Sequence, residues 1–373
     1  IIYGGIILKE RHFFAGNNTS KGFHSFFDYI ISSEEAEHIY ILKGGPGVGK
    51  SSFMKKFISR FQAKGYDLEY IHCSSDNDSL DAIVIPCLKI AMVDGTAPHT
   101  IDPKFPGIID EIINLGQFID VTKLQANKLD ILQTNKAKSN AYKSAYRYLE
   151  CANIIIEEIN SIYDRATNDL KFTQIAKDVI DSIYNSKPVS ISENLYNKSN
   201  SGKQGYLRKL FSDAITADGY ISFIDSLCKG NSVWMIVGQN TNYVSKLLDR
   251  IAGEALKRGH LVEGFYRPLN PDKLQHILIP ELNLIFRSSD KPIEGSFDEV
   301  IDLNPIIDIE ILNSYKMYIE NNLELYDIML ENAYSKLQDT RKYHSILENY
   351  YVKSMDFNGV DALFDRLFPD LKI

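Results

Sequence analysis

The sequence has few cysteines and no long apolar run, and each scarcity excludes a class of protein. Its four cysteines form no CxxC pair and show no spacing typical of a metal-binding cluster. Reduced thiols in a cytoplasmic protein are expected for cysteines of this kind. No run of about 18 apolar residues occurs, so no helix that spans a membrane is predicted. The apolar N-terminus, residues 1–14, meets charge at Lys9 and is predicted to be a buried first strand rather than a signal peptide.

An excess of positive charge is lacking as well. The formal net charge of −8 argues against general binding to nucleic acid. The one basic stretch, residues 123–147, includes Lys128, Lys136, Lys138 and Lys143 against a single acid, and is predicted to be the solvent-facing side of a helix. A chain of 373 residues that is 44% hydrophobic and 24% charged predicts a globular protein of two or three domains.

Residues 44–51 read GGPGVGKS and match the phosphate-binding loop pattern G-x-x-x-x-G-K-[ST]. Its glycines let the main chain curl around phosphates with the N–H groups pointing inward. Lys50 is predicted to reach the β and γ phosphates of a bound ATP, and the Ser51 hydroxyl to hold Mg²⁺. The residues predicted to bind the nucleotide are Gly44, Gly45, Pro46, Gly47, Val48, Gly49, Lys50, Ser51 and Ser52.

The flanking sequence has the order that a phosphate-binding loop requires. Residues 38–43 (HIYILK) predict a short buried strand, and residues 51–65 predict an amphipathic helix that ends near Gly65. The start of that helix adds its partial positive charge to the loop. Strand, loop and helix together predict nucleotide binding.

A magnesium-binding acid is expected at the end of a second buried strand, and LKIAMVDG places Asp94 there. Ser51 and Asp94 are therefore the predicted metal-binding residues, with an ordinary turn acid as the alternative for Asp94. No acidic residue follows Asp94, so the sequence does not promise rapid hydrolysis of ATP.

His99, in the segment TAPH, completes the predicted catalytic set with Lys50 and Asp94. Action on the γ-phosphate or on a substrate is one interpretation of His99, and a structural role is the other. Three acids follow the segment EYIHC and are expected to line the same rim or, for the second of them, to cap a helix: Asp76, Asp78 and Asp81.

The chain contains an internal repeat. Shifting the numbering by 194 places residues 38–94 on residues 232–288 without a gap, with ten identities in 57 positions. In the second loop, GQNTNYVS (residues 238–245), Val244 replaces the lysine, Tyr243 replaces a glycine, and Ser288 replaces Asp94. These three changes predict a degenerate second site that does not hold magnesium triphosphate.

Pairs that both halves retain are attributed to folding rather than to function, namely Arg11 with Arg208 and Phe26 with Phe223. Each half continues into a helical stretch, residues 122–187 and 308–373, and each stretch is predicted to form an antiparallel hairpin that projects from its own sheet. A polar linker is expected at residues 185–205. The predicted fold is α/β, with duplicated domains of the P-loop NTPase type at residues 1–195 and 196–373.

The segments RHFFAGNNTSKGFHSFFDYI, HIYILKGGPGVGKSSFMKKF, HCSSDNDSLDAIVIP and VDGTAPHTIDPKFPGIIDEIINLG resemble a bacterial family of tandem P-loop proteins. That family is usually labelled only as ATPase or hypothetical protein. The resemblance covers nearly the whole chain and implies ATP binding at residues 44–51 and a magnesium-binding acid at Asp94. Relatives often keep a usable second loop, and GQNTNYVS departs from that pattern.

Three functions remain open. The first function is a slow ATPase or nucleotide switch in which the degenerate second half regulates the site of the first half. The repeat register places Arg267 opposite Cys73 and Arg287 opposite Val93, so these arginines are candidates to stabilise charge at that site. The second is a small-molecule phosphotransferase, and the third an interaction protein that uses ATP structurally. The expected partners are ATP, Mg²⁺ and an unidentified protein or small molecule, without a membrane or a clear nucleic acid.

Overall fold

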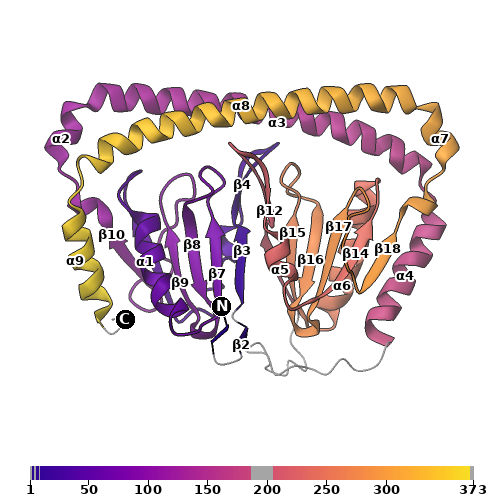
Figure 1. Ribbon diagram of the computed structural model, residues 1–373, viewed down its shortest axis with the longest axis horizontal. Coiled ribbons are helices and arrows are strands. Elements are labelled where there is room, and N and C mark those ends of the chain that lie inside the picture. Colours follow the sequence, from indigo (N-terminus) through magenta and orange to yellow (C-terminus); the bar gives the residue numbers. More distant parts are fainter. Residues whose placement is uncertain (1, 4–5, 8, 186–204, 370–373) are drawn as a thin grey trace.

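The computed structural model describes residues 2–3, 6–7, 9–185 and 205–369, which form two six-stranded sheets side by side with helices around them (Figure 1). A two-domain α/β fold with mostly parallel sheets flanked by helices is therefore confirmed. The linker predicted at residues 185–205 lies almost entirely outside the described residues. None of the helices in the described ranges combines the length and apolar character that crossing a bilayer requires.

The first sheet has the strand order β10-β6-β9-β8-β7-β3, and β8 runs antiparallel to both of its neighbours while the other neighbouring pairs are parallel. Its strands are β3 (Glu10–Phe14), β6 (His38–Lys43), β7 (Leu68–His72), β8 (Leu80–Ile85), β9 (Ile90–Asp94) and β10 (Asp110–Asn114). Helix α1 (Lys50–Gln62) follows β6 and buries its apolar face, as the sequence predicts.

The second sheet repeats this design, with the order β11-β15-β16-β17-β14-β18 and an antiparallel β16 in the place of β8. Its strands are β11 (Tyr206–Leu210), β14 (Ser232–Val237), β15 (Leu261–Tyr266), β16 (Leu274–Ile279), β17 (Leu284–Ser289) and β18 (Glu299–Asp302). Helix α6 (Thr241–Lys257) takes the place of α1. The matching strand orders are what the internal repeat predicts.

Smaller elements complete the two halves. Hairpins pair β1 (Ile2–Tyr3) with β2 (Ile6–Ile7), β4 (Gly16–Thr19) with β5 (Gly22–Ser25), and β12 (Asp213–Thr216) with β13 (Gly219–Ser222). The short helices are α2 (Val121–Ala126), α5 (Ile224–Cys228) and α7 (Ile309–Ser314). The 3-10 turns are η1 (Phe27–Tyr29), η2 (Pro86–Leu88), η3 (Leu115–Phe118), η4 (Pro280–Leu282) and η5 (Asn304–Ile306).

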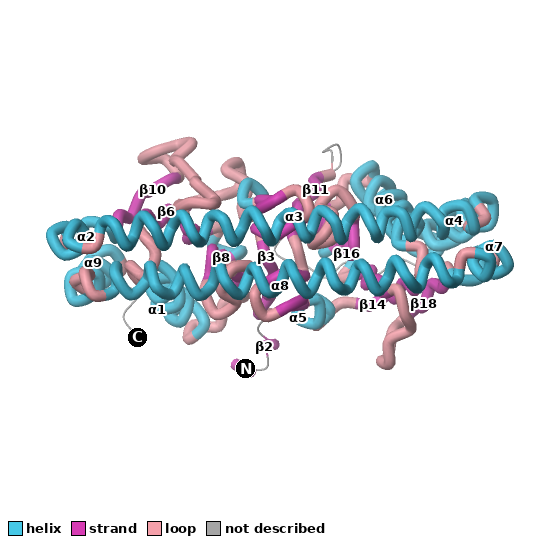
Figure 2. The backbone as a smooth tube through the Cα atoms, turned by 90° about the horizontal axis from the view of Figure 1, so that it is seen from above, coloured by secondary structure: helices cyan, strands magenta, loops and turns pink. Residues whose placement is uncertain are grey.

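Two helical arms cross between the halves. The first arm consists of α3 (Lys128–Ala166) and α4 (Asp169–Asn185), and the second of α8 (Lys316–Val352) and α9 (Phe357–Leu367). Helices α3 and α8 pack along each other in opposite directions over both sheets (Figure 1), and they lie side by side when seen from above (Figure 2). At 1.5 Å per residue, helices of this length span about 55–60 Å, enough to cover both halves.

The prediction of a hairpin on each half is therefore wrong. Helix α4 packs on the second half, where Phe172 lies 4.8 Å from Tyr243 between ring centroids. Helix α9 packs on the first half, where Phe364 lies 4.9 Å from Phe53. Apolar periodicity shows that one face of a helix is buried but does not say which surface covers it. In each arm, the last helix packs on the half that does not directly precede it in the chain.

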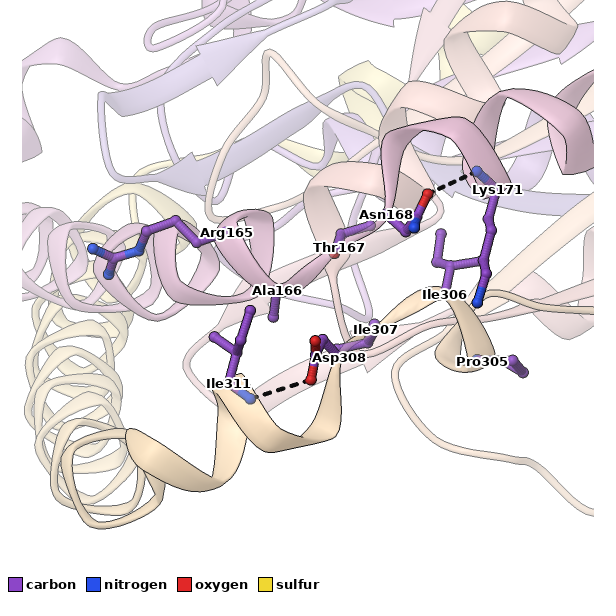
Figure 3. A pocket seen from close by; sticks show the side chains of 10 residues that line it. All are labelled: Arg165, Ala166, Thr167, Asn168, Lys171, Pro305, Ile306, Ile307, Asp308 and Ile311. Carbon is purple, nitrogen blue, oxygen red and sulfur yellow. Dashed lines mark hydrogen bonds between the residues drawn. The ribbon is translucent and has the colours of Figure 1, made fainter.

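The first arm turns sharply where α3 meets α4, beside the start of α7 (Figure 3). Asn168 caps α4 by accepting a hydrogen bond from the main-chain N–H of Lys171 at 3.0 Å, and Asp308 caps α7 by accepting one from Ile311 at 3.3 Å. The hollow between these two caps is lined by polar and aliphatic groups, its two capping side chains are already bonded to main-chain N–H groups, and the guanidinium of Arg165 points away from it. It is a junction in the packing and not a site of converging functional groups.

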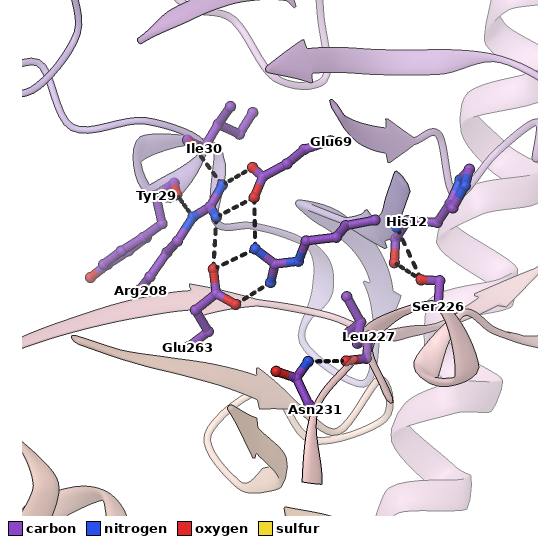
Figure 4. A network of polar contacts seen from close by, with 10 residues as sticks. His12, Tyr29, Ile30, Glu69, Arg208, Ser226, Leu227, Asn231 and Glu263 are labelled. Atoms are coloured by element: carbon purple, nitrogen blue, oxygen red, sulfur yellow. Dashed lines mark hydrogen bonds and ion pairs between the residues drawn. The ribbon is translucent and has the colours of Figure 1, made fainter. Parts of the chain in front are cut away.

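Four charged side chains join the two sheets at their adjacent edge strands (Figure 4). The Arg11 guanidinium donates to Glu69 at 2.9 Å and to Glu263, and the Arg208 guanidinium donates to Glu69 at 2.7 Å and to Glu263 at 2.9 Å. The two glutamates are each 1% exposed. Arg11 is the repeat equivalent of Arg208, and Glu69 that of Glu263, so the quartet is nearly symmetric. The attribution of the arginine pair to folding is confirmed.

The phenylalanines that both halves retain, Phe26 and Phe223, also pack against the opposite half. Phe26 packs against Phe211 of the second half at 4.8 Å between ring centroids, and Phe223 packs against Phe14 of the first half at 5.1 Å. Phe14 and Phe211 in addition form a β-bridge. The pair Phe26 and Phe223 is thus part of the core that joins the halves, as the sequence predicts.

Glu263 makes the stability of the interface dependent on pH. Burial alone would raise the pKa of Glu263, but Arg11 and Arg208 lower it below its ordinary value of 4.5. A carboxyl with a lowered pKa stabilises the fold above its unfolded pKa, and the contribution is lost as the pH falls through the folded pKa. We expect Glu263→Gln to be less stable than the wild type at pH 7, with a difference that shrinks below pH 4.5. Urea unfolding at several pH values measures this, and Glu254→Gln, at a surface ion pair, serves as the control.

Candidate functional site

The first loop, residues 44–51, joins the end of β6 to the start of α1. Gly47 and Gly49 adopt positive φ angles of 71° and 91°, which glycine tolerates better than any other residue. Helix α1 begins at Lys50, and Gly49 at its N-cap offers no side chain to satisfy the first main-chain N–H groups. These N–H groups remain able to bind an anion at a helix N-terminus.

Lys50 lies inside the loop. Its Nζ donates hydrogen bonds to the main-chain oxygens of Gly44 at 3.0 Å and Gly45 at 2.9 Å, and it lies 3.5 Å from Oδ2 of Asp94. The Ser51 hydroxyl oxygen accepts a hydrogen bond from the N–H of Leu80 at 3.1 Å and keeps a second lone pair. The structure thus brings Asp94 next to Lys50 in the loop, although the two residues lie far apart in the sequence.

Asp94 stands at the carboxyl end of β9, next to β6 in the sheet. Its Oδ1 accepts hydrogen bonds from the N–H of Thr96 at 2.9 Å and from the Thr96 hydroxyl at 2.5 Å. Burial raises the pKa of Asp94, and Lys50 and Thr96 oppose that rise. No group of three or more His, Cys, Asp or Glu in the described ranges has the arrangement of a protein-only metal site. Mg²⁺ in nucleotide sites instead takes one or two carboxylates with phosphates and water, and the donors here fit that set.

His99 forms a buried pair with Asp81. Its Nε2 lies 3.5 Å from Asp81 Oδ1, and its ring stacks on Phe27 with 4.3 Å between centroids. Burial alone would lower the pKa of His99, but Asp81 outweighs it and raises the pKa above the ordinary value. The ion-pair partner of His99 is thus Asp81, which the sequence assigned to the rim of the site only as one of three acids.

The other two rim acids have local roles. Asp76 accepts a hydrogen bond from the Ser79 hydroxyl at 2.5 Å, and the main-chain oxygen of Asp78 accepts one from Lys55. The predicted helix cap at Asp78 is wrong, because Leu80 begins strand β8 and no helix follows. An Asp-rich turn before an apolar run looks the same in sequence whether a helix or a strand comes next.

The second arm lies directly over the first loop. A Cβ atom added to Gly45 would stand 2.5 Å from the Tyr351 ring, and one added to Gly47 would stand 3.0 Å from the main-chain oxygen of Glu348. These glycines therefore allow helix α8 to approach the loop closely, in addition to any role with phosphate. The sequence did not reveal this contact because it placed the second arm on the other half.

Charged side chains continue from the loop into both arms. His344 and Glu348 of α8 pair at 3.5 Å, and Lys138 Nζ of α3 lies 3.5 Å from His344 Nδ1. The His344 hydrogen bond lowers the pKa of Glu348, and Lys50 and Lys138 contribute to the same effect. The solvent-facing prediction is correct for Lys128, Lys136 and Lys143 and wrong for Lys138, which is half-buried beneath the paired arms.

The second loop is filled by the protein itself. The Asn240 side chain caps α6 by accepting hydrogen bonds from the N–H groups of Asn242 at 3.1 Å and Tyr243 at 3.3 Å. From the first arm, Asp164 accepts a hydrogen bond from the Asn242 side chain at 2.8 Å, and Asp169 accepts one from the Tyr243 hydroxyl at 2.5 Å. The Asn240 side chain thus satisfies two N–H groups of the helix start, and the two carboxylates place negative charge where a phosphate would have to bind.

Restoring the two loop residues is not expected to restore binding in the second half. In a Tyr243→Gly, Val244→Lys variant, Asp164 and Asp169 still place negative charge at the start of α6, and Ser288 still supplies no carboxylate. We expect this double variant to bind the same number of ATP molecules per chain as the wild type. Calorimetric titration measures the number, and one additional ATP per chain would contradict the account of the second loop.

The two candidate arginines of the second half differ in their surroundings. Arg287 donates to Asp225 at 2.7 Å in a surface ion pair. Arg267 is half-buried, its Nε has no hydrogen-bond partner among the described residues, and the loss of solvent around it lowers its pKa against the influence of Tyr220 and Asp213. Their described contacts do not include the first loop.

Comparisons of the chain with protein families, with curated proteins and with solved structures find no match. The class that the structure defines is a two-domain α/β protein with exchanged helical arms. The likeness to tandem P-loop proteins stays a prediction from the sequence.

Proposed function

We propose that the protein binds Mg²⁺ and ATP at the first loop and acts as a slow ATPase or nucleotide-dependent switch. The observation that carries the proposal is the convergence of three groups at one uncapped helix start. Lys50 lies between the loop carbonyls and Asp94, and Ser51 lies at the first turn of α1. A strand–loop–helix with these residue types is suited to a triphosphate.

The chain's own groups have distinct roles in this proposal. The loop N–H groups and Lys50 bind the β and γ phosphates, for which Lys50 exchanges its main-chain partners for phosphate oxygens. The Ser51 hydroxyl and the Asp94 carboxylate would hold Mg²⁺, the second of them through water, and the ion would supply positive charge against the phosphates. Asp94 already has one oxygen engaged by Thr96, which fixes the orientation of its carboxylate.

Slow turnover and switching follow from the surroundings of the loop. Gly95 and Thr96 follow Asp94, so β9 supplies no adjacent carboxylate to orient water. The described contacts of Arg267 and Arg287 leave both away from the loop. Helix α8 rests on Gly45 and Gly47, so a change in the loop on binding or hydrolysis would be transmitted to an arm that spans both halves. That arm is the surface on which an unidentified partner would read the nucleotide state.

Product analysis and hydrogen exchange together test the proposal. With Mg²⁺ and ATP, we expect slow release of ADP and free phosphate, and slower amide exchange at residues 344–357 with ATP than with ADP. EDTA is the matched control and should remove both effects. Transfer of phosphate to an added acceptor would favour the phosphotransferase, and binding without turnover or a change in exchange would favour a structural nucleotide. Absence of any ATP binding would overturn the proposal.

A further inference from the structure

Asp81 lies between the two groups that are proposed to hold magnesium. Its predecessor Leu80 donates its N–H to the Ser51 hydroxyl at 3.1 Å, and its successor Ala82 pairs with Val93, the residue before Asp94. Because β8 runs antiparallel to β9, the start of β8 and the end of β9 meet at the same edge of the sheet. The Asp81 charge also contributes to raising the pKa of Asp94.

The Asp81 carboxylate is buried and incompletely satisfied. It is 3% exposed, its Oδ2 has no close hydrogen-bond donor among the described residues, and the buried Cys73 thiol interacts with the carboxylate. Its Oδ1 faces His99, which is 8% exposed and whose Nδ1 likewise lacks a partner within the described ranges. A buried carboxylate oxygen without a partner is costly, so it indicates a ligand that satisfies it in another state of the protein.

The second half supplies an independent comparison. Gln275 stands at the repeat position of Asp81, and Ser288 at that of Asp94. There the Gln275 side chain donates to the Tyr220 hydroxyl at 3.0 Å, and the Ser288 hydroxyl donates to the main-chain oxygen of Gln275 at 2.6 Å. At these two positions the second half has neutral hydrogen bonds in place of carboxylates, and the buried acid beside them is Asp213, which pairs with His276 at 3.4 Å. The two acids change together with Lys50, as parts of one site do.

We propose that Asp81 is a second acid of the magnesium site, which accepts hydrogen bonds from the water shell of the nucleotide-bound ion, and that His99 is the positioning residue that holds it. This inference rests on the proposed Mg²⁺ and ATP site and deepens it. One Asp81 oxygen is fixed by His99, which leaves Oδ2 for water on the ion. Outer-shell carboxylates of this kind orient coordinated water without touching the metal.

The test compares the affinity for ATP with Mg²⁺ and with EDTA, in the wild type and in Asp81→Asn. The ratio of these two affinities measures how far the metal strengthens nucleotide binding. Loss of an outer-shell partner typically weakens metal affinity 10–100-fold, so we expect the ratio to fall by about tenfold or more in Asp81→Asn. Affinity in EDTA should stay the same or rise, since one negative charge near the phosphates is removed. Asp76→Asn, at a nearby turn acid, is the matched control and should keep the wild-type ratio.

A second variant separates positioning from folding. His99→Gln removes the ion-pair partner of Asp81, and we expect an intermediate ratio together with an altered EPR spectrum of Mn²⁺ in the ATP complex. If Asp81→Asn fails to fold, the affinity ratio and the Mn²⁺ spectrum of His99→Gln test the inference instead. An unchanged ratio and spectrum, while the wild type binds ATP more tightly with Mg²⁺, would overturn this inference alone. A wild type that binds no ATP would overturn the proposed function instead.

Discussion

Replacing Arg208 with leucine is expected to lower the free energy of unfolding by about 3–5 kcal/mol. The Arg208 side chain donates to both Glu69 and Glu263, and to the main-chain oxygens of Tyr29 and Ile30. Without it, two carboxylates that are 1% exposed depend on Arg11 alone. An uncompensated buried charge is the reason that breaking such a network costs more than its net contribution. Urea unfolding at pH 7 measures the difference.

A surface arginine provides the comparison for Arg208. Arg258 pairs with Glu254 one turn away on α6 and is 47% exposed. Arg258→Leu should change the free energy of unfolding by about 1 kcal/mol or less, because its ion pair with Glu254 and its stacking on Tyr184 are both exposed to solvent. Equal, small losses for the two variants would mean that the quartet between the sheets contributes little to the union of the halves.

Lys50→Ala is expected to weaken ATP binding about 100-fold or more. Hydrogen bonds to charged groups contribute about 1.5–3 kcal/mol each, and Lys50 is the proposed cation at the β and γ phosphates. A loss of about 2.7 kcal/mol corresponds to 100-fold in the dissociation constant. The free protein should also lose some stability, because the Lys50 side chain is 10% exposed and its removal leaves the Asp94 carboxylate, which is 14% exposed, without its cation. Calorimetric titration with Mg²⁺ and ATP gives the affinity.

The control for Lys50 lies on the same helix. Lys55 is exposed on α1 and donates to the main-chain oxygen of Asp78, outside the loop. Lys55→Ala should bind ATP like the wild type. A similar loss of affinity in both variants would indicate a general effect of charge on α1 rather than a specific contact of Lys50.

The sequence predicted the part of the site that parallel strands assemble. Strand β6 leads into the loop and β9 ends at Asp94, and neighbouring parallel strands bring their carboxyl ends to one edge of the sheet. Pattern and spacing therefore placed Lys50 and Asp94 on the same edge. The repeat in the same way anticipated a second sheet with the order of the first, and Arg11 and Arg208 as structural.

The contribution of Asp81 was harder to see, because β8 is antiparallel. Its first residues, and not its last, reach the edge where β6 and β9 end. The sequence carries no local signal for strand direction, so Asp81 was indistinguishable from the turn acids Asp76 and Asp78. Only the structure shows that the Asp81 carboxylate is buried and thereby distinguishes Asp81 from Asp76 and Asp78.

The exchange of the arms could not be predicted from the sequence for a different reason. The apolar spacing within residues 122–187 and 308–373 predicted helices with a buried face, but two similar halves offer two similar surfaces for α4 and α9. Phe364 on Phe53, and Tyr351 beside Gly45, arise only because the second arm returns to the first half. Contacts across such sequence distances depend on the global topology and not on local periodicity.

The number of nucleotides bound per chain tests the central claim most directly. The claim is that the first loop accepts Mg²⁺ and ATP, while side chains of the first arm close the second loop. Calorimetric titration of the wild type with Mg²⁺ and ATP should give one site per chain, and Lys50→Ala should remove it. Two sites per chain, or one site that persists in Lys50→Ala, would contradict the account.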